Sequence, residues 1–286
     1  MFTVIGATGH VGREAVRLLL ERGQEVAAVS RSGHPSAVLP DGAHLVSGDP
    51  SRPASLATTL PGHIEALLLG PRPVGTAAAE LLSLAAERGA KQVVALSALT
   101  VEQPIGHPRF IEEFLAFEDA VRSSALPWTV LRCADFATNS LAWAPQIRAS
   151  GAVHGAYAAA ATSPVHPRDI AEVAVRALSE PGYTGQAHAL TGPRSLDQRD
   201  KVQIIGDTIG RELTFREVDP EEVRRTMLAQ GLPADVPERL LGSLAGYAKT
   251  PGHTYDTVER ILDRPALGYA RWVSENAAAF TGTGGE

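Results

Sequence analysis

The chain has 286 residues, enough for one large α/β domain or for a core with a smaller lobe. Hydrophobic residues make up 44% and charged residues 20%, and the net charge of −6 gives no attraction to nucleic acid or to an anionic membrane. The single cysteine, Cys133, excludes an internal disulfide, and we expect no cleavable signal and no membrane helix, so the expected location is cytoplasmic.

The first predicted elements are a strand, a glycine turn and a helix. Residues 2–5 form an apolar run, and apolar residues recur at helical spacing over residues 11–19. Between them lie three glycines spaced Gly-x-x-Gly-x-x-Gly: Gly6 permits a tight turn, Gly9 lets the backbone approach a pyrophosphate, and Gly12 lets the helix pack close to the sheet. The phosphates would bind free N–H groups at the helix N-terminus. This order predicts a dinucleotide site, and the alternative is a glycine-rich turn of some other α/β protein.

The second strand, residues 25–29, leads into Ser30 and Arg31. NAD-specific folds usually have an acidic residue here, which binds the ribose 2′-hydroxyl. A guanidinium with a serine on each side suits a 2′-phosphate instead, so the sequence predicts NADPH as the cofactor. The alternative is an arginine in a solvated loop.

Three more strands alternate with helices, as in a parallel, doubly wound sheet. The run over residues 64–69 is continuously apolar, as expected of a strand buried on both faces. The segments that follow these strands, Gly70-Pro71 and Ser97-Ala98, should lie at the carboxyl edge of the sheet, where ligands bind. The predicted strands are residues 44–49, 64–69 and 92–96, and the predicted helices are residues 53–60 and 76–88.

The second half of the chain is mostly helical. Ser195 and Gln198 have the spacing of a capping box for a helix that ends at Ile209, and Pro220 stands at the first position of a helix that begins after Asp219. We expect the glycine-rich tail, residues 281–286, to be disordered. The other predicted helices are residues 108–124, 135–150, 165–179, 237–248, 256–262 and 272–280, and the predicted strands are residues 128–132, 188–191 and 214–218.

These patterns divide the chain into a core and a lobe. The nucleotide-binding core is residues 1–133, completed by residues 164–180, and residues 134–163 and 181–286 form a smaller, mostly helical substrate lobe. The expected fold is an α/β, Rossmann-like, doubly wound parallel sheet with this lobe at its C-terminal side. The default substrate site is the cleft at the carboxyl edge of the strands.

Motifs along most of the chain resemble one family. The glycine turn is similar to the Gly-Ala-Thr-Gly-x-x-Gly of extended and atypical short-chain dehydrogenases/reductases. The resemblance narrows to the NmrA-like atypical members, which include quinone and triphenylmethane reductases and some redox-sensing regulators. It runs from Met1 to about Phe280 and is carried by Glu118, residues 124–132, Phe136, Asn139, residues 169–171 and residues 190–193.

The resemblance implies further site residues. It places Asp49 near the adenine, although Asp49 has the alternative of being a turn or N-cap residue. It places Phe136 and Asn139, which are one helical turn apart, at the nicotinamide end of the cleft. In the alternative, Phe136 belongs to the core of the lobe and Asn139 is an amide on the helix surface. The expected cofactor-binding residues are Gly6, Thr8, Gly9, His10, Val11, Gly12, Ser30, Arg31, Asp49, Leu69, Gly70, Pro71, Ser97 and Ala98.

The usual catalytic acid is missing. Ordinary short-chain dehydrogenases carry Tyr-x-x-x-Lys, in which the tyrosine donates a proton and the lysine lowers its pKa. Residues 97–128 contain neither residue type, and alignment on Glu118 puts Phe110 and Phe114 at the two positions. Ser97 has no base nearby in the sequence, and His107 is a candidate proton donor. The catalytic residue stays unassigned, and no metal-ligand spacing is present.

Two residues depart from the family pattern. Cys133 stands where relatives often have proline, and it is either a small buried hydrophobe or a reactive thiol. His166 stands where many relatives have aspartate, and it either faces the substrate or is an ordinary loop residue.

The leading functional hypothesis is an NADPH-dependent oxidoreductase that acts on a small, aromatic or quinone-like molecule, because such acceptors take hydride without an acid in the same step. A non-catalytic NADP(H)-sensing regulator and a non-redox biosynthetic enzyme are the alternatives, since both would also lack the acid. We expect a small-molecule substrate, no nucleic-acid or membrane partner, and a monomer or homodimer.

Overall fold

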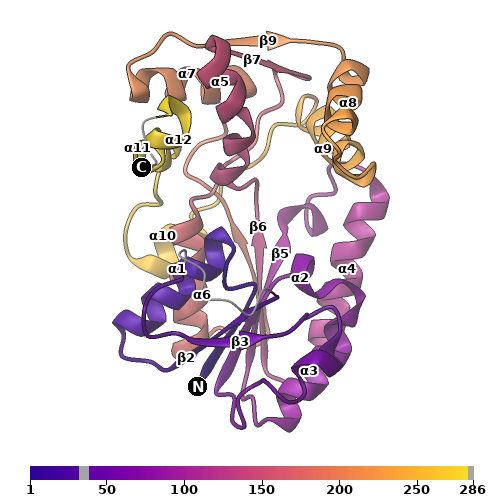
Figure 1. Cartoon of the computed structure of the whole chain (residues 1–286), viewed down its shortest axis with the longest axis vertical. Helices are drawn as coiled ribbons and strands as arrows, with labels where there is room; N and C mark the ends of the chain where they lie inside the picture. Colours follow the sequence, from indigo (N-terminus) through magenta and orange to yellow (C-terminus); the bar gives the residue numbers. More distant parts are fainter. Residues whose placement is uncertain (32–38, 283–286) are drawn as a thin grey trace. The chain divides into compact units, whose positions relative to one another are not determined.

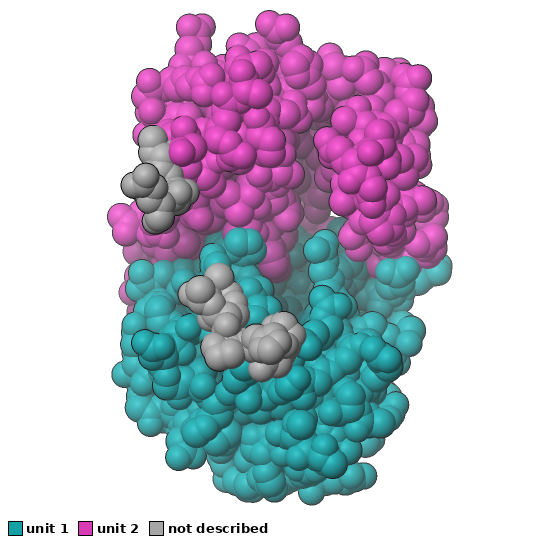
Figure 2. Space-filling view, viewed as in Figure 1, with its two compact units in different colours: residues 1–101, 112–133, 167–190 teal, residues 102–111, 134–166, 191–286 magenta. Residues whose placement is uncertain are grey.

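The computed structural model describes residues 1–31 and 39–282 (Figure 1). Ser32 and the end of the predicted tail, residues 283–286, lie outside the described residues. No helix in the described part of the chain is long and apolar enough to cross a membrane. The chain forms two compact units (Figure 2): unit 1 is residues 1–101, 112–133 and 167–190, and unit 2 is residues 102–111, 134–166 and 191–286.

Unit 1 is built on a parallel sheet. Its strands are β1 (Phe2–Ile5), β2 (Val26–Ser30), β3 (His44–Ser47), β4 (Ala66–Leu69), β5 (Val93–Ala98), β6 (Trp128–Cys133) and β8 (Gln186–Leu190). In the described residues they form one seven-stranded sheet in the order β3-β2-β1-β4-β5-β6-β8. The strand order reverses between β1 and β4, which is the point where doubly wound folds bind ligands. The predicted fold class is confirmed.

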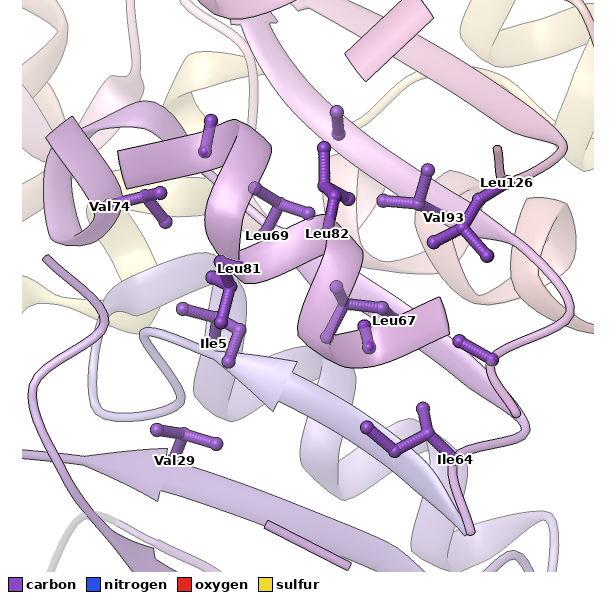
Figure 3. Packing of buried hydrophobic residues seen from close by; sticks show 14 of the residues in the cluster. Ile5, Val29, Ile64, Leu67, Leu69, Val74, Leu81, Leu82, Val93 and Leu126 are labelled. Atoms are coloured by element: carbon purple, nitrogen blue, oxygen red, sulfur yellow. The ribbon is translucent and has the colours of Figure 1, made fainter. Parts of the chain in front are cut away.

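Helices cover both faces of this sheet. Figure 1 shows α1 (His10–Glu21) and α6 (Pro167–Ser179) on one side of the strands, and α3 (Ala78–Glu87) and α4 (Pro108–Arg122) on the other. Under α3, apolar side chains of neighbouring strands meet Leu81 and Leu82, both 1% exposed (Figure 3). Burial of this continuous apolar layer is the main force that holds the sheet and the helices together. Shorter elements of unit 1 are η1 (Pro53–Leu56), α2 (Pro71–Val74), η2 (Gly75–Ala77) and η3 (Leu99–Val101).

The boundary of the core differs from the predicted one. The sequence analysis ended the core at residue 180, but β8 pairs with β6 in parallel, with Thr129 opposite Gln186, and so belongs to the sheet. Residues 102–111, expected in the core, belong to unit 2. Both differences come from contacts between distant parts of the chain, which leave no local pattern.

Unit 2 is mostly helical and has its own core around Trp272. The Trp272 ring stacks on Tyr269 at 5.6 Å and meets the edge of Phe280 at 6.1 Å between ring centroids. Its elements are η4 (Ala137–Trp143), α5 (Ala144–Ser150), β7 (Ala152–Gly155), α7 (Gln198–Ile209), β9 (Thr214–Glu217), α8 (Pro220–Ala229), α9 (Asp235–Tyr247), α10 (Thr257–Leu262), α11 (Tyr269–Glu275) and α12 (Ala277–Thr281).

Several predicted elements of unit 2 need correction. The helix predicted over residues 135–150 is a 3-10 segment, η4, followed by the short helix α5. The helix predicted over residues 272–280 is interrupted at Asn276, whose φ of −118° is not helical. The strand β7 was not predicted; it pairs in parallel with β9.

The capping box of α7 was assigned to the wrong residues. The N-cap is Asp197, whose carboxylate accepts the N–H of Asp200 at 2.8 Å, while Asp200 accepts the N–H of Asp197. Aspartate is as good an N-cap as serine. The helix therefore begins at Gln198, directly after the Asp197 cap, and Gln198 is not the third residue of a helix capped by Ser195. The start of α8 is as predicted, with Pro220 in its first turn and the N-cap carboxylate of Asp219 bonded to the N–H of Glu221.

Candidate functional site: the glycine turn of unit 1 and the buried ion pairs

The glycine turn brings the start of α1 against the end of β1. Gly6 has a φ of +78°, and its carbonyl accepts the N–H of Gly9 at 3.0 Å. A Cβ on Gly12 would lie 2.3 Å from the carbonyl oxygen of Gly6 and 2.9 Å from the Cα of Ala7. No side chain fits there, so glycine is required for this packing. These are the structural roles that the spacing predicts, and contact with a pyrophosphate stays a prediction.

The first turn of α1 is open to an anion. Gly9 is its extended N-cap and gives no side-chain cap, and the first turn contains no acidic residue. The first N–H groups of a helix have no acceptor within the helix, so they remain available for a ligand. Thr8 and Gly9 are exposed, while Val11 is buried under the helix. The turn therefore offers uncapped N–H donors on an exposed stretch of backbone, as the predicted phosphate site requires.

Arg13, which contacts His10, adds a positive charge beside this turn. Burial, and then the charge of Arg13, lowers the pKa of His10, so its imidazole is neutral at neutral pH. The Arg13 guanidinium can only donate, so it donates to Nδ1 of His10 at 3.0 Å and leaves the ring proton on Nε2. A cationic guanidinium is thereby held at the same end of α1, where it favours an anion.

The end of β2 carries the residues predicted to recognise the ribose. Ser30 is buried, and Arg31, the next residue, is exposed. An exposed guanidinium after β2 is placed as the prediction requires, and its contact with a 2′-phosphate stays a prediction.

Asp49 has a local structural role. One carboxylate oxygen accepts the N–H and the hydroxyl of Ser51 at 3.1 and 2.7 Å, and the other accepts Nε of Arg52 at 3.1 Å. The hydrogen bonds from Ser51, and more weakly those from Arg52, lower the pKa of Asp49. Asp49 therefore has the role of a turn residue, which was the alternative given for it. These hydrogen bonds do not test the predicted contact of Asp49 with the adenine.

The segment after β4 lies beside the glycine turn. Leu69 is buried at the end of the strand, and Gly70 leads into a one-turn helix, α2, where a loop was expected. The ring of Pro73 would be 3.3 Å from a Cβ on Gly6, so α2 packs against the turn. Gly70 and Pro71 therefore lie at the same carboxyl edge as the glycine motif.

The predicted site residue Ser97 takes part in a buried ionic cluster. Its hydroxyl donates to Oε1 of Glu118 at 2.8 Å, and Glu118 is 2% exposed. Arg132 donates to both oxygens of this carboxylate, at 3.0 and 2.9 Å, and Arg122 donates to Oε2 at 3.0 Å. Burial alone would raise the pKa of Glu118, but the hydrogen bonds from Arg132, Ser97 and Arg122 hold it below its usual value. So weak a base does not activate Ser97 as a nucleophile. Ala98, the last residue of β5, is partly exposed.

The two predicted substrate residues belong to unit 2 and do not share a helical face. Phe136 has an extended backbone, with φ −81° and ψ 133°, and its position bridges to Val165. Asn139 lies in η4 and is exposed, and its amide donates to Oδ1 of Asp135 at 2.5 Å. The shared face inferred from the i, i+3 spacing is wrong because the α-helix does not form there. Substrate contact by either residue remains a prediction.

Asp135 is the centre of a second, partly buried cluster, which sequence reasoning missed. Its Oδ2 accepts Nζ of Lys201 at 2.9 Å and the hydroxyl of Thr162 at 2.8 Å, and Lys201 also donates to Thr162 at 2.6 Å. Burial raises the pKa of Asp135, but the charge and the hydrogen bond of Lys201 outweigh it, so the net pKa is lowered. Lys201 is 3% exposed and shares the buried face of α7 with Val202 and Ile205. A lysine on an otherwise apolar helix face was the one feature of the sequence that pointed to this cluster.

The remaining candidate residues have structural surroundings. Burial raises the pKa of the Cys133 thiol, which fits a small buried hydrophobe and not a reactive thiol. His166 is buried, and its Nε2 lies 3.1 Å from Oε2 of Glu275. Nδ1 of His107 accepts the N–H of Arg109 at 3.2 Å. At the positions of the missing pair, Phe110 is buried with the Arg109 guanidinium 4.7 Å from its ring centroid, and Phe114 is partly exposed.

The Glu118 cluster predicts a stability effect with a defined pH window. Glu118→Gln removes the charge that compensates Arg132, and because the partners are partly exposed, the expected loss lies toward the lower end of about 3–5 kcal/mol. A carboxyl whose folded-state pKa is lowered contributes fully above its unfolded value, 4.5 here, and loses that contribution as pH falls through the folded-state value. Urea unfolding should therefore show a large difference from the wild type at pH 7 that narrows below pH 4.5.

The matched control for this experiment is Glu112→Gln, an exposed position on the same helix. Equal unfolding midpoints for the two variants at pH 7 would contradict the assignment.

Comparison with known proteins agrees with this geometry. A family model described as NAD(P)H-binding matches residues 6–181. The chain is 34% identical over 282 residues to (4-alkanoyl-5-oxo-2,5-dihydrofuran-3-yl)methyl phosphate reductase of Streptomyces griseus subsp. griseus, covering 98% of this chain and 99% of that protein. It is 30% identical over 288 residues to NAD(P)H azoreductase of Xenophilus azovorans, covering 98% and 99% of the two chains.

A solved structure shows the same fold over nearly the whole chain. An NADPH-dependent quinone oxidoreductase of Escherichia coli, complexed with NADPH, has a TM-score of 0.81 at 23% identity and covers 97% of this chain and 100% of its own. Since the family model spans more than half of the sequence and the S. griseus reductase matches nearly all of it, the chain belongs to the NAD(P)H-binding, NmrA-like family of atypical short-chain dehydrogenases/reductases.

Proposed function

We propose that the protein is an NADPH-dependent reductase of a small, aromatic or quinone-like acceptor. The observation that carries the proposal is the open first turn of α1 on the Gly6–Gly12 motif, together with an α4 that offers Phe110 and Phe114 in place of a tyrosine and a lysine. NADPH, when bound, supplies a hydride. The chain's own residues bind its phosphates and orient the acceptor.

The acceptor class follows from the missing acid. A simple ketone gains charge on its oxygen as hydride arrives, so it needs a proton donor in the same step. A quinone spreads that charge over a conjugated system and tolerates a site without such a donor. The names of the relatives point to conjugated acceptors too: an azo compound, a quinone and an unsaturated furanone.

The preference for NADPH rests on Arg31. Its guanidinium is exposed after β2, where an NAD-specific protein would have a carboxylate. A charge-assisted hydrogen bond to the 2′-phosphate would favour NADPH, whereas NADH offers only a hydroxyl. This proposal concerns the choice between the two cofactors, and binding of the dinucleotide itself depends on the glycine turn.

Gly9→Val tests the phosphate site. A Cβ at this position would lie 3.3 Å from the carbonyl oxygen of Gly6, so the fold should accept it with a small shift, while the branched side chain covers the free N–H groups. Titration should show loss of NADPH binding. The matched control is Gly268→Val, because Gly268 is also a helix N-cap, with φ −74° and ψ 158° against −74° and 164° for Gly9. Unchanged NADPH affinity in Gly9→Val would remove the glycine turn from the site.

Arg31→Ala tests the cofactor choice. Loss of one charged hydrogen bond should weaken NADPH by about 1.5–3 kcal/mol and leave NADH nearly unchanged. The dissociation constants of both cofactors, measured at the same ionic strength, give the answer. An equal loss for NADPH and NADH would show that Arg31 does not read the 2′-phosphate.

The reaction is tested by following NADPH absorbance with a panel of quinones, azo dyes and aromatic ketones. We expect catalytic NADPH consumption with the conjugated acceptors, absent in Gly9→Val. Tight NADPH binding without turnover of any acceptor would overturn the reductase in favour of a sensor. Turnover of another compound with NADPH unconsumed would indicate a non-redox enzyme.

A further inference from the structure

The uncapped end of α1 combines backbone donors with a histidine. The N–H groups that have no acceptor among the described residues are those of His10, Val11 and Gly12. The next N–H, that of Arg13, bonds to the carbonyl of Gly9 at 2.9 Å and begins the helical pattern. Side chains of a helix lean toward its N-terminus, so the imidazole of His10, the first residue of α1, lies at this same end. An anion on the free N–H groups would therefore have the His10 ring as a neighbour.

His10 and Arg13 form a pair that depends on an unprotonated ring. The Arg13 guanidinium donates to Nδ1 of His10 at 3.0 Å, and this bond exists only while Nδ1 carries no proton. Burial, and then the charge of Arg13, lowers the pKa of His10, so the unprotonated ring is the form at neutral pH. Both side chains are partly exposed, and within the described residues their other N–H groups have no partner. Those donors are available to a ligand.

Among the described residues, Arg13 is the one charge that shifts the pKa of His10. The strands next to α1, β1 and β2, have no ionisable side chain. On α1 itself, Glu14 is bonded to Arg17. The ionisable side chains on α6, which packs on α1, and on α2, beside the glycine turn, do not contribute to the pKa of His10; they are Arg168, Asp169, Glu172 and Arg176 on α6 and Arg72 on α2. A bound anion would thus change the charge balance at His10.

We propose, on the basis of the NADPH site proposed above, that Arg13 and His10 bind the pyrophosphate of NADPH together and that His10 takes up one proton from the solvent as they do so. Arg13 exchanges its bond to Nδ1 for a bond to a phosphate oxygen. The freed Nδ1 accepts the proton, and the imidazolium then also donates to the phosphates. Two cations can lie this close together because the negative charges of the pyrophosphate face them; in the free protein they would repel each other.

This exchange gives NADPH binding a defined pH dependence. The pKa of His10 is below its ordinary value in the free protein, and the neighbouring phosphates raise it in the complex. Between these two values, binding takes up a proton, and the affinity rises by at most about tenfold for each unit by which the pH falls. At higher pH His10 is neutral in both states, and at lower pH it is charged in both, so its contribution is then constant.

Isothermal titration calorimetry with NADPH tests the proton uptake, because the heat of binding changes with the ionisation heat of the buffer in proportion to the protons taken up. The 2′-phosphate of NADPH also titrates near pH of about 6, so the contribution of His10 is the difference between the wild type and His10→Gln. We expect the wild type to take up more protons than His10→Gln at pH 6, and the two to agree at pH 9. The matched control is His63→Gln, an exposed histidine of unit 1, which should keep the uptake of the wild type.

Arg13→Gln tests the other half of the pair. Loss of one charge-assisted hydrogen bond should weaken NADPH binding by about ten- to a hundredfold. Arg17→Gln, on the same helix, is the control and should keep the wild-type affinity, because Arg17 is bonded to Glu14 and Glu21. The melting temperatures of the His10 and Arg13 variants should stay near that of the wild type, since both side chains are partly exposed.

Equal proton uptake by the wild type and His10→Gln at pH 6 would overturn the inference, and so would an unchanged NADPH affinity of Arg13→Gln. A wild type that binds no NADPH at either pH would refute the proposed cofactor site, and this inference with it. A wild type that binds NADPH with the expected uptake but reduces no acceptor would refute the reductase and support the role of His10 and Arg13.

Discussion

The contact between Gly12 and the backbone of Gly6 is the constraint on which unit 1 depends. With 2.3 Å between the position of a Cβ and a carbonyl oxygen, α1 can begin this close to β1 only if residue 12 has no side chain. The start of the helix then lies at the carboxyl edge of the sheet with its N–H groups open. Because α1 packs on α6, the same contact also sets how helices cover that face of the sheet. The packing of α1 on β1, and the open N–H groups that the proposed phosphate site needs, thus depend on one glycine.

Much of unit 1 could be predicted because its signals are local. Strands buried on both faces are continuous apolar runs, such as Ala66–Leu69, and each is followed by a helical pattern. Unit 2 was harder. β7 has four residues, and it exists because it pairs with β9, about sixty residues further along the chain. The cap of α7 was misplaced because serine and aspartate stand two residues apart, and local sequence does not decide between two good caps.

In the candidate site, too, local features could be predicted from the sequence and long-range contacts could not. The glycine turn is contiguous, so its spacing was visible in the sequence. The partners of Asp135 are not: Lys201 is 66 residues away and Thr162 is 27 residues away. Asn139 was singled out as a ligand contact, but its amide also serves this cluster. Contacts of this kind depend on the tertiary fold, and only the unusual lysine on an apolar helix face hinted at one of them.

The burial of Cys133 has a practical consequence. It is the chain's one cysteine, and its thiol is enclosed with a raised pKa, so thiol-directed reagents should leave the native protein unmodified. Cysteines introduced at exposed positions, as in Glu112→Cys of unit 1 and Arg225→Cys of unit 2, would then be the sole labelling sites. A pair of spin or fluorescent labels on these two positions would measure the separation of the units in solution, and its change when NADPH is added, without any need to remove a native thiol.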